Sequence, residues 1–244
     1  MKTDTVATRG SGAVRRVLEA ELRAARARGE HQPHVVDVGG GSGGWAVPLA
    51  SAGCLVTVVE PNPNALATLR RRAEEEGVSG SITAIADDSD ALGAHVAAGS
   101  ADLVLAHGLL EVVDDPALVL AALAAAVKPG GAVSVLVANR HAAILQRALA
   151  GRLGEARELL AAESGVLGGG RETVLRRFDA EALRAQLIAV GLDVTSLQGD
   201  GVVADFVPGG VREEDLAEFE LAAATVSPLR DISSRLHVLA RRPA

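Results

Sequence analysis

The chain has 244 residues, which is long enough for one large α/β domain with a substantial core. Hydrophobic residues make up 48% and charged residues 23%, and this composition excludes a disordered chain. The net charge of −7 excludes a general attraction for nucleic acid, and the single cysteine excludes an internal disulfide. No apolar run reaches the roughly 20 residues of a membrane span, and no leader segment opens the sequence. We therefore expect a cytoplasmic protein with no membrane partner.

Taken in chain order, an arginine-rich helix is expected first, and short β-branched runs then alternate with helical patterns. The expected helices are 12–29, 45–51, 63–76, 89–97 and 116–127, and the expected strands are 34–38, 55–59, 81–85, 101–106 and 132–138. Apolar strands that alternate with helices indicate a parallel sheet with both faces covered. The sequence therefore predicts a doubly wound, Rossmann-like α/β fold whose ligand lies at the carboxyl ends of the strands.

After the fifth strand the alternation breaks. Two helical pieces at 141–150 and 155–163 lead into a loop with three glycines at 168–170. A helix at 179–190, a strand at 192–197, an acidic helix at 213–224 and a last strand at 233–240 follow, which gives a mostly parallel sheet of seven strands. We predict a single domain over residues 1–244, with a helical cover (1–33), a cofactor-binding core (34–138), a helical insert (139–178) and a C-terminal completion of the sheet (179–244).

The stretch VVDVGGGSGGW at 35–45 places five glycines directly after the first strand. Gly39, Gly41 and Gly44 satisfy the G-x-G-x-x-G pattern, in which bare backbone and helix amides approach a ligand closely. Glu60 ends the second strand about 20 residues later, where an acid would hold a ribose diol. The pattern alone leaves NAD and S-adenosylmethionine open, because both carry an adenosine.

Three surrounding features favour the methyl donor. Asp37 precedes the loop and can meet a cationic amino acid ligand, whereas a buried carboxylate suits a pyrophosphate poorly. Asp87 and Asp88 follow the third strand, where they can meet the amine of adenine. The stretches ADLVLAHGLLEVVDDP at 101–116 and VKPGG at 127–131 complete the set.

With these motifs, residues 37–137 resemble the core of the class I S-adenosylmethionine-dependent methyltransferases. The resemblance implies that Gly39, Gly40 and Gly41 pass under the amino acid part of the cofactor and that Glu60 holds the ribose hydroxyls. It further implies that Asp87 and Asp88 flank the adenine and that His107 stands beside the methyl group.

A longer resemblance extends from about residue 10 to 242. GLLEVVDDP, KPGG and ANRHAAILQRALAG are similar to the tRNA 5-carboxymethoxyuridine methyltransferases, which esterify a carboxylate on a wobble uridine. That resemblance implies that Arg15 contacts the cofactor and that Asn139 lies near the substrate pocket. The chain departs from the family at Gly201, Ala204 and Phe206, which replace basic and aromatic residues, and at Arg235, which is shifted by one position.

The insert is locally basic, and its arginines could either meet RNA or cover a solvated helix face: Arg140, Arg147, Arg152, Arg171, Arg176 and Arg177.

We predict an S-adenosylmethionine-dependent methyltransferase that acts on a carboxylate, with tRNA as one acceptor and a small metabolite as another, and without a metal. His107 and Asn139 are the predicted catalytic residues. A carboxylate needs no general base, whereas a phenol or amine would use His107 as the base. The alternatives are a small-molecule O- or N-methyltransferase, an NAD-dependent oxidoreductase and a catalytically silent protein that binds an adenosyl ligand.

Overall fold

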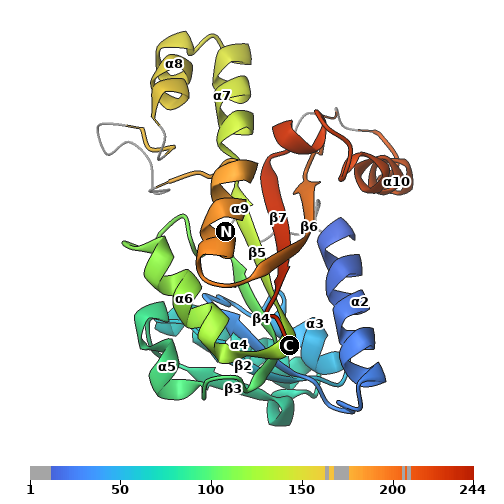
Figure 1. Cartoon of the computed structure of the whole chain (residues 1–244). Coiled ribbons are helices and arrows are strands. Elements are labelled where there is room, and N and C mark those ends of the chain that lie inside the picture. The colour runs from blue at the N-terminus through green and yellow to red at the C-terminus, as the bar shows by residue number, and fades with distance from the viewer. Residues whose placement is uncertain (1–11, 163–164, 168–175, 205–206, 208–209) are drawn as a thin grey trace.

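A sheet of seven strands forms the middle of the computed structural model, which describes residues 12–162, 165–167, 176–204, 207 and 210–244 (Figure 1). The strands lie in the order β3-β2-β1-β4-β5-β7-β6. β1 to β5 run parallel, and β7 pairs antiparallel with both β5 and β6. The strands are β1 (His34–Val38), β2 (Leu55–Val59), β3 (Ile82–Ile85), β4 (Ala101–His107), β5 (Val127–Ala138), β6 (Asp193–Asp200) and β7 (Arg235–Arg241).

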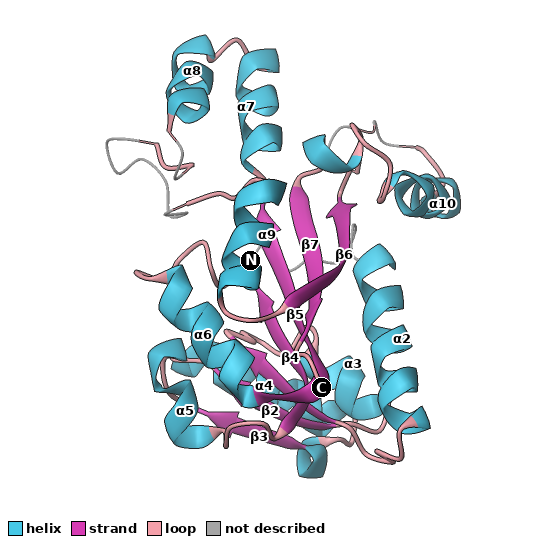
Figure 2. Cartoon of the chain, in the orientation of Figure 1, coloured by secondary structure: helices cyan, strands magenta, loops and turns pink. Residues whose placement is uncertain are grey.

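Helices cover both faces of the sheet, as Figure 2 shows. One face packs against α2 (Gly12–Ala27), α3 (Ala46–Ser51) and α4 (Pro63–Glu75) through a core rich in valine and leucine. The other packs against α5 (Leu92–His95), α6 (Pro116–Ala126) and α9 (Ala180–Ala189). The expected doubly wound fold with a mostly parallel seven-stranded sheet is therefore confirmed.

The helical insert follows the fifth strand, as predicted. α7 (Arg140–Leu149) and α8 (Leu153–Ala161) pack on each other beyond the end of β5 (Figure 1). α10 (Glu213–Ala223) packs beside α2. Short 3-10 turns complete the description: η1 (Ser79–Ser81), η2 (Ser89–Ala91) and η3 (Arg230–Ile232).

Helix starts follow local side-chain chemistry. Asn62 and Asp115 each accept two backbone N–H groups of the first turn of α4 and α6, and a proline opens each helix. The two helices follow the carboxyl ends of β2 and β4 in the chain. The loops that lead into them lie at one edge of the sheet, where a parallel fold collects its ligand-binding residues.

Most boundaries lie within two residues of the prediction, but two strand ends differ by three residues or more and one helix is divided. The fifth strand begins at Val127, because Val127 already pairs with Ala101 before residues 128–131 bulge out of the ladder and pairing resumes at Ala132. The sixth strand continues to Asp200, since β7 supplies backbone partners as far as that residue. The helix expected at 89–97 is the turn η2 followed by the short α5.

The loop with glycines 168–170 lies outside the described residues. None of the helices in the described part is long and apolar enough to cross a membrane. The assignment of the whole chain to one domain stays a prediction.

Candidate active site

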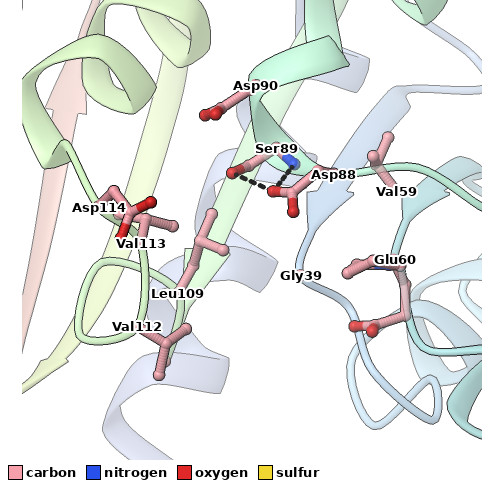
Figure 3. A pocket seen from close by; sticks show the side chains of 12 residues that line it. Gly39, Val59, Glu60, Asp88, Ser89, Asp90, Leu109, Val112, Val113 and Asp114 are labelled. Atoms are coloured by element: carbon pink, nitrogen blue, oxygen red, sulfur yellow. Dashed lines mark hydrogen bonds between the residues drawn. The ribbon is translucent and has the colours of Figure 1, made fainter. Parts of the chain in front are cut away.

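A pocket of about 410 Å³ opens at the carboxyl ends of β1, β2 and β4 (Figure 3). This volume falls within the range of small-molecule sites. Figure 3 shows the turn that carries Asp88 and Ser89 on one side of the pocket, and Leu109 and Val112 on another. The wall consists of Gly39, Val59, Glu60, Pro61, Asp88, Ser89, Asp90, Gly108, Leu109, Val112, Val113 and Asp114.

Glu60 joins the glycine loop to the start of α4. One carboxylate oxygen accepts the N–H of Gly41 at 3.0 Å, and the other accepts the N–H of Asn62 at 2.8 Å. Gly41 adopts a φ of +55°, a region that favours glycine. Glu60 is buried yet lines the pocket, so its remaining lone pairs are available to a ligand hydroxyl group.

Asp37 lies directly beneath the glycine loop. A β-carbon at Gly40 would stand 2.7 Å from the Asp37 Oδ2 atom and 2.8 Å from Val58, so only glycine fits between them. Oδ2 is buried and has no hydrogen-bond partner within the described structure. Burial, reinforced by the negative charge of Glu60, raises the pKa of Asp37 from 3.8 to about 7. A buried acid that lacks a partner is a good counter-charge for a ligand ammonium group.

The two aspartates after β3 lie in different surroundings. Asp88 caps η2 by accepting the N–H and the hydroxyl of Ser89, and both residues line the pocket. Asp87 instead pairs with His95 at 2.7 Å, and this hydrogen bond lowers the pKa of Asp87 below its usual value. The Asp87 side chain is thus engaged outside the pocket wall.

His107 ends β4 and lies between two aromatic rings. The ring of Trp45 meets it edge to face at 5.1 Å, and the ring of His237 does so at 6.0 Å. The Arg15 guanidinium stands 5.9 Å from the centre of the Trp45 ring, so the start of α2 reaches this end of the site. Burial, with the charges of His237 and Arg235, lowers the pKa of His107 well below 6.5, so the ring is neutral.

A chain of buried polar side chains leads away from His107 across the sheet, and we call it the buried polar chain. His107 Nε2 lies 2.8 Å from the Ser134 hydroxyl, which lies 2.8 Å from His237 Nε2. His237 Nδ1 in turn lies 3.1 Å from the Gln198 Nε2 atom. The three added residues were not predicted as site residues.

Asn139 holds the junction between β5, α7 and the start of β7. Its Oδ1 atom accepts the N–H of His141 at 2.9 Å. Its Nδ2 atom donates to the carbonyls of Asp231 and Ser233 at 2.9 and 2.7 Å. Both amide protons are therefore used within the protein.

Glu111 lies in the loop that follows β4. One of its oxygens accepts the N–H of Ala138 at 2.7 Å, and the other is buried without a partner in the described structure. Burial raises the pKa of Glu111, although the nearby Arg235 partly opposes the shift. Arg235 itself pairs with the buried Asp200.

Five of the six arginines singled out in the insert are described, and all five contact other groups of the protein. Arg140 pairs with Asp179, Arg147 and Arg152 pair with Glu155, and the remaining two donate to backbone carbonyls. The latter two are Arg176 and Arg177, while Arg171 lies outside the described residues. Within the described ranges, no three His, Cys, Asp or Glu side chains gather to hold a metal ion.

Comparison with known proteins shows which family the chain resembles. A family model described as a methyltransferase domain matches residues 12–197. The tRNA 5-carboxymethoxyuridine methyltransferase of Escherichia coli K12 is 25% identical over 221 residues, which cover 88% of this chain and 82% of that protein. A ubiquinone biosynthesis O-methyltransferase of Methylocella silvestris is 33% identical over 180 residues, which cover 73% of this chain and 64% of that protein.

The fold also has counterparts among solved structures. An S-adenosylmethionine-dependent methyltransferase of Methanosarcina mazei superposes with a TM-score of 0.61 at 15% identity. The superposition covers 87% of this chain and 93% of that chain.

Proposed function

The chain belongs to the methyltransferase domain family and uses S-adenosylmethionine as its methyl donor, and from this premise we propose that it methylates a carboxylate oxygen of its acceptor. The relative that supports this acceptor class is the tRNA 5-carboxymethoxyuridine methyltransferase, whose similarity extends over most of the chain. We propose 5-carboxymethoxyuridine in tRNA as the first acceptor to test, followed by a small carboxylic acid.

The observation that carries the proposal is the arrangement of Asp37, Gly40 and Glu60: Glu60 lines the pocket, and Asp37 lies beneath Gly40 of the adjoining glycine loop. A side chain at Gly40 would fill the space above Asp37, so bare backbone is kept where the amino acid part of the cofactor would lie. Asp37 would face the cofactor ammonium group, and Glu60 would accept the ribose hydroxyls with its free lone pairs.

The adenine would lie beside the turn that carries Asp88. Ser89 and Asp88 line the pocket there, opposite Leu109, which supplies an apolar surface for the base. Asp87 stays a predicted adenine neighbour, with its carboxylate already bound by His95. Arg15 would reach the cofactor from the start of α2, beside Trp45.

When bound, S-adenosylmethionine supplies an activated methyl group, and its transfer to a carboxylate oxygen releases no proton. The task of the protein is then to hold the acceptor oxygen in line and to exclude water, which can contribute several kcal/mol. His107 would contact the acceptor at the end of β4. We leave Asn139 out of the proposed catalytic set, because its amide protons are both held by backbone carbonyls.

A hydroxyl acceptor is the second candidate, and the similarity to ubiquinone biosynthesis O-methyltransferases favours it. Such an acceptor loses a proton during transfer and needs a base. The neutral His107 is then the nearest candidate for that base.

Calorimetric titration with S-adenosylhomocysteine, with NAD in parallel, tests the cofactor end. Transfer of a labelled methyl group to three acceptors then tests the acceptor class: tRNA that carries 5-carboxymethoxyuridine, phenoxyacetate and catechol. We expect binding of S-adenosylhomocysteine alone and base-labile label on a carboxylate. Label on catechol alone would move the function to the hydroxyl class, and binding without any transfer would indicate a silent adenosyl-binding protein.

A further inference from the structure

The buried polar chain links four adjacent strands through side chains alone. His107 belongs to β4, Ser134 to β5, His237 to β7 and Gln198 to β6. The other three members of the chain are nearly inaccessible, at 0%, 0% and 5% exposure for Ser134, His237 and Gln198. A buried polar network of this length is costly unless each member is bonded, so the hydrogen bonds fix where each proton lies.

The direction of the chain follows from its far end. With the Gln198 amide nitrogen turned toward His237, Nε2 of Gln198 donates, so His237 Nδ1 accepts and His237 carries its proton on Nε2. That proton is donated to the Ser134 oxygen, and the hydroxyl proton of Ser134 is then donated to His107 Nε2. His107 is left with its proton on Nδ1.

Among the ring nitrogens of the buried polar chain, Nδ1 of His107 is buried and lacks a hydrogen-bond partner within the described structure. An unsatisfied buried N–H destabilises the protein, and a bound hydrogen-bond acceptor would remove that cost. His107 is not itself part of the pocket wall, but Gly108 and Leu109, which follow it in the chain, are, and the proposed function places the His107 ring beside the acceptor.

We propose that Gln198, His237 and Ser134 are positioning residues that keep the proton of the His107 ring on Nδ1. The Nδ1–H group then selects a methyl acceptor by donating a hydrogen bond to its anionic oxygen, and His107 does not act as a base. The inference rests on the proposed function and makes it more specific. A ring that presents N–H to the site cannot take a proton there, so a hydroxyl acceptor lacks a base. A carboxylate accepts the hydrogen bond with one oxygen and presents the other to the methyl group.

The first test reads the proton position directly in the wild-type protein. Long-range proton–nitrogen correlation spectra of the ¹⁵N-labelled protein distinguish protonated from bare ring nitrogens, and a His107→Gln variant assigns the signals. We expect a single neutral form with the proton on Nδ1. A proton on Nε2 would overturn the inference, because the chain would then run the other way and leave a basic lone pair at the site.

Variants of the buried polar chain test the positioning role. Ser134→Ala removes the donor to His107 Nε2, and Gln198→Met removes the group that sets the direction at similar volume. We expect both to mix the two proton positions of His107, whereas Ser134→Thr, which keeps the hydroxyl, restores the wild-type form. Gln146→Met on α7 is the matched control and leaves the spectrum unchanged. Wild-type spectra in a folded Ser134→Ala variant would contradict the positioning role.

Ligand probes test the selection step. In the complex with S-adenosylhomocysteine, we expect phenoxyacetate to shift the His107 Nδ1 signals and catechol to leave them unchanged. With phenoxyacetate as acceptor, Ser134→Ala should lower kcat/KM about tenfold without changing the affinity for S-adenosylhomocysteine. Saturation with phenoxyacetate and no shift would overturn the selection. Failure to bind S-adenosylhomocysteine would reject the proposed function instead, while the proton position in the free protein could still be read.

Discussion

The two ends of the site are built in different ways. At the adenosine end, Glu60 and Asp88 sit in loops, and their carboxylates bond to nearby backbone N–H groups at the sheet edge. At the other end, His107 bonds into the buried polar chain, whose side chains come from four strands. Loops whose backbone is fixed by these carboxylates suit a ligand that is recognised by its shape. A chain of hydrogen-bonded side chains that ends at His107 Nδ1 suits a ligand recognised by its hydrogen-bond acceptor.

The largest expected effect concerns the loop end. Glu60→Ala removes the proposed ribose acceptor and also releases the Gly41 N–H. Because hydrogen bonds to charged groups contribute about 1.5–3 kcal/mol, we expect the affinity for S-adenosylhomocysteine to fall about 100-fold in a calorimetric titration. Glu75→Ala, which changes an exposed acid on α4, is the control. If Glu60→Ala stays folded and its affinity is unchanged, the ribose role is wrong.

Asp37→Asn should weaken binding and strengthen the fold. The folded pKa of about 7 lies above the ordinary 3.8, so the folded state holds a proton that the unfolded chain releases between about pH 4 and 7. The wild type therefore loses stability as pH rises through this window, whereas an amide does not titrate. At pH 8 we expect the free energy of unfolding of Asp37→Asn to be about 2 kcal/mol higher than that of the wild type. We expect the variant to bind S-adenosylhomocysteine about tenfold more weakly.

The pH dependence of binding sharpens the same prediction. Below about pH 6, Asp37 is protonated in the free protein and cannot pair with an ammonium group. The wild-type affinity should then fall toward that of Asp37→Asn, whose own affinity should vary little with pH. Parallel curves for the two proteins in calorimetry from pH 5 to 8 would exclude Asp37 as the counter-charge.

Asn139→Ala distinguishes structural from catalytic use of the amide. The variant loses a helix cap and two buried hydrogen bonds, so we expect its free energy of unfolding to fall by about 2 kcal/mol in denaturant titration. Asn139→Asp, which places an acceptor against two carbonyls, should be less stable still. We expect kcat to stay within about twofold for the folded alanine variant. A loss of kcat in that variant would return Asn139 to the catalytic set.

The smallest effect is expected at Asp87. Its carboxylate is paired with His95 and does not line the pocket, so Asp87→Ala should change the affinity for S-adenosylhomocysteine less than about twofold. Asp88→Ala, which removes a pocket residue and the bonds to Ser89, should weaken binding about fivefold. The reverse order of these two variants in the same titration would place the adenine on the other aspartate.

The loop end could be predicted from sequence because its signals are local. Glycines follow a buried strand, and Glu60 ends the next apolar run, so both positions follow from strand–turn patterns. Trp45 was not predicted, although the only tryptophan of the chain stands directly after the glycine loop.

The buried polar chain left no such signal. Ser134 and His237 are 103 residues apart, and only the insertion of β7 between β5 and β6 brings them together. Gln198 lies just beyond the expected end of its strand at 197, because Gly199 and Asp200 resemble a turn in sequence. The pairing of β6 with β7 decides that boundary, and pairing between distant strands cannot be seen in a local pattern.

The order of the sheet has a consequence for a chain still being synthesised. β7 is the last strand of the chain, yet it fills the place between β5 and β6, and Arg241 at its end holds Glu21 of α2 through two hydrogen bonds. A nascent chain that has left the ribosome only as far as β5 already contains Asp37, Glu60 and Asp88. His107 gains its neighbour His237 only once β7 has been synthesised, so the residues of the loop end are present in the nascent chain well before the buried polar chain can be completed.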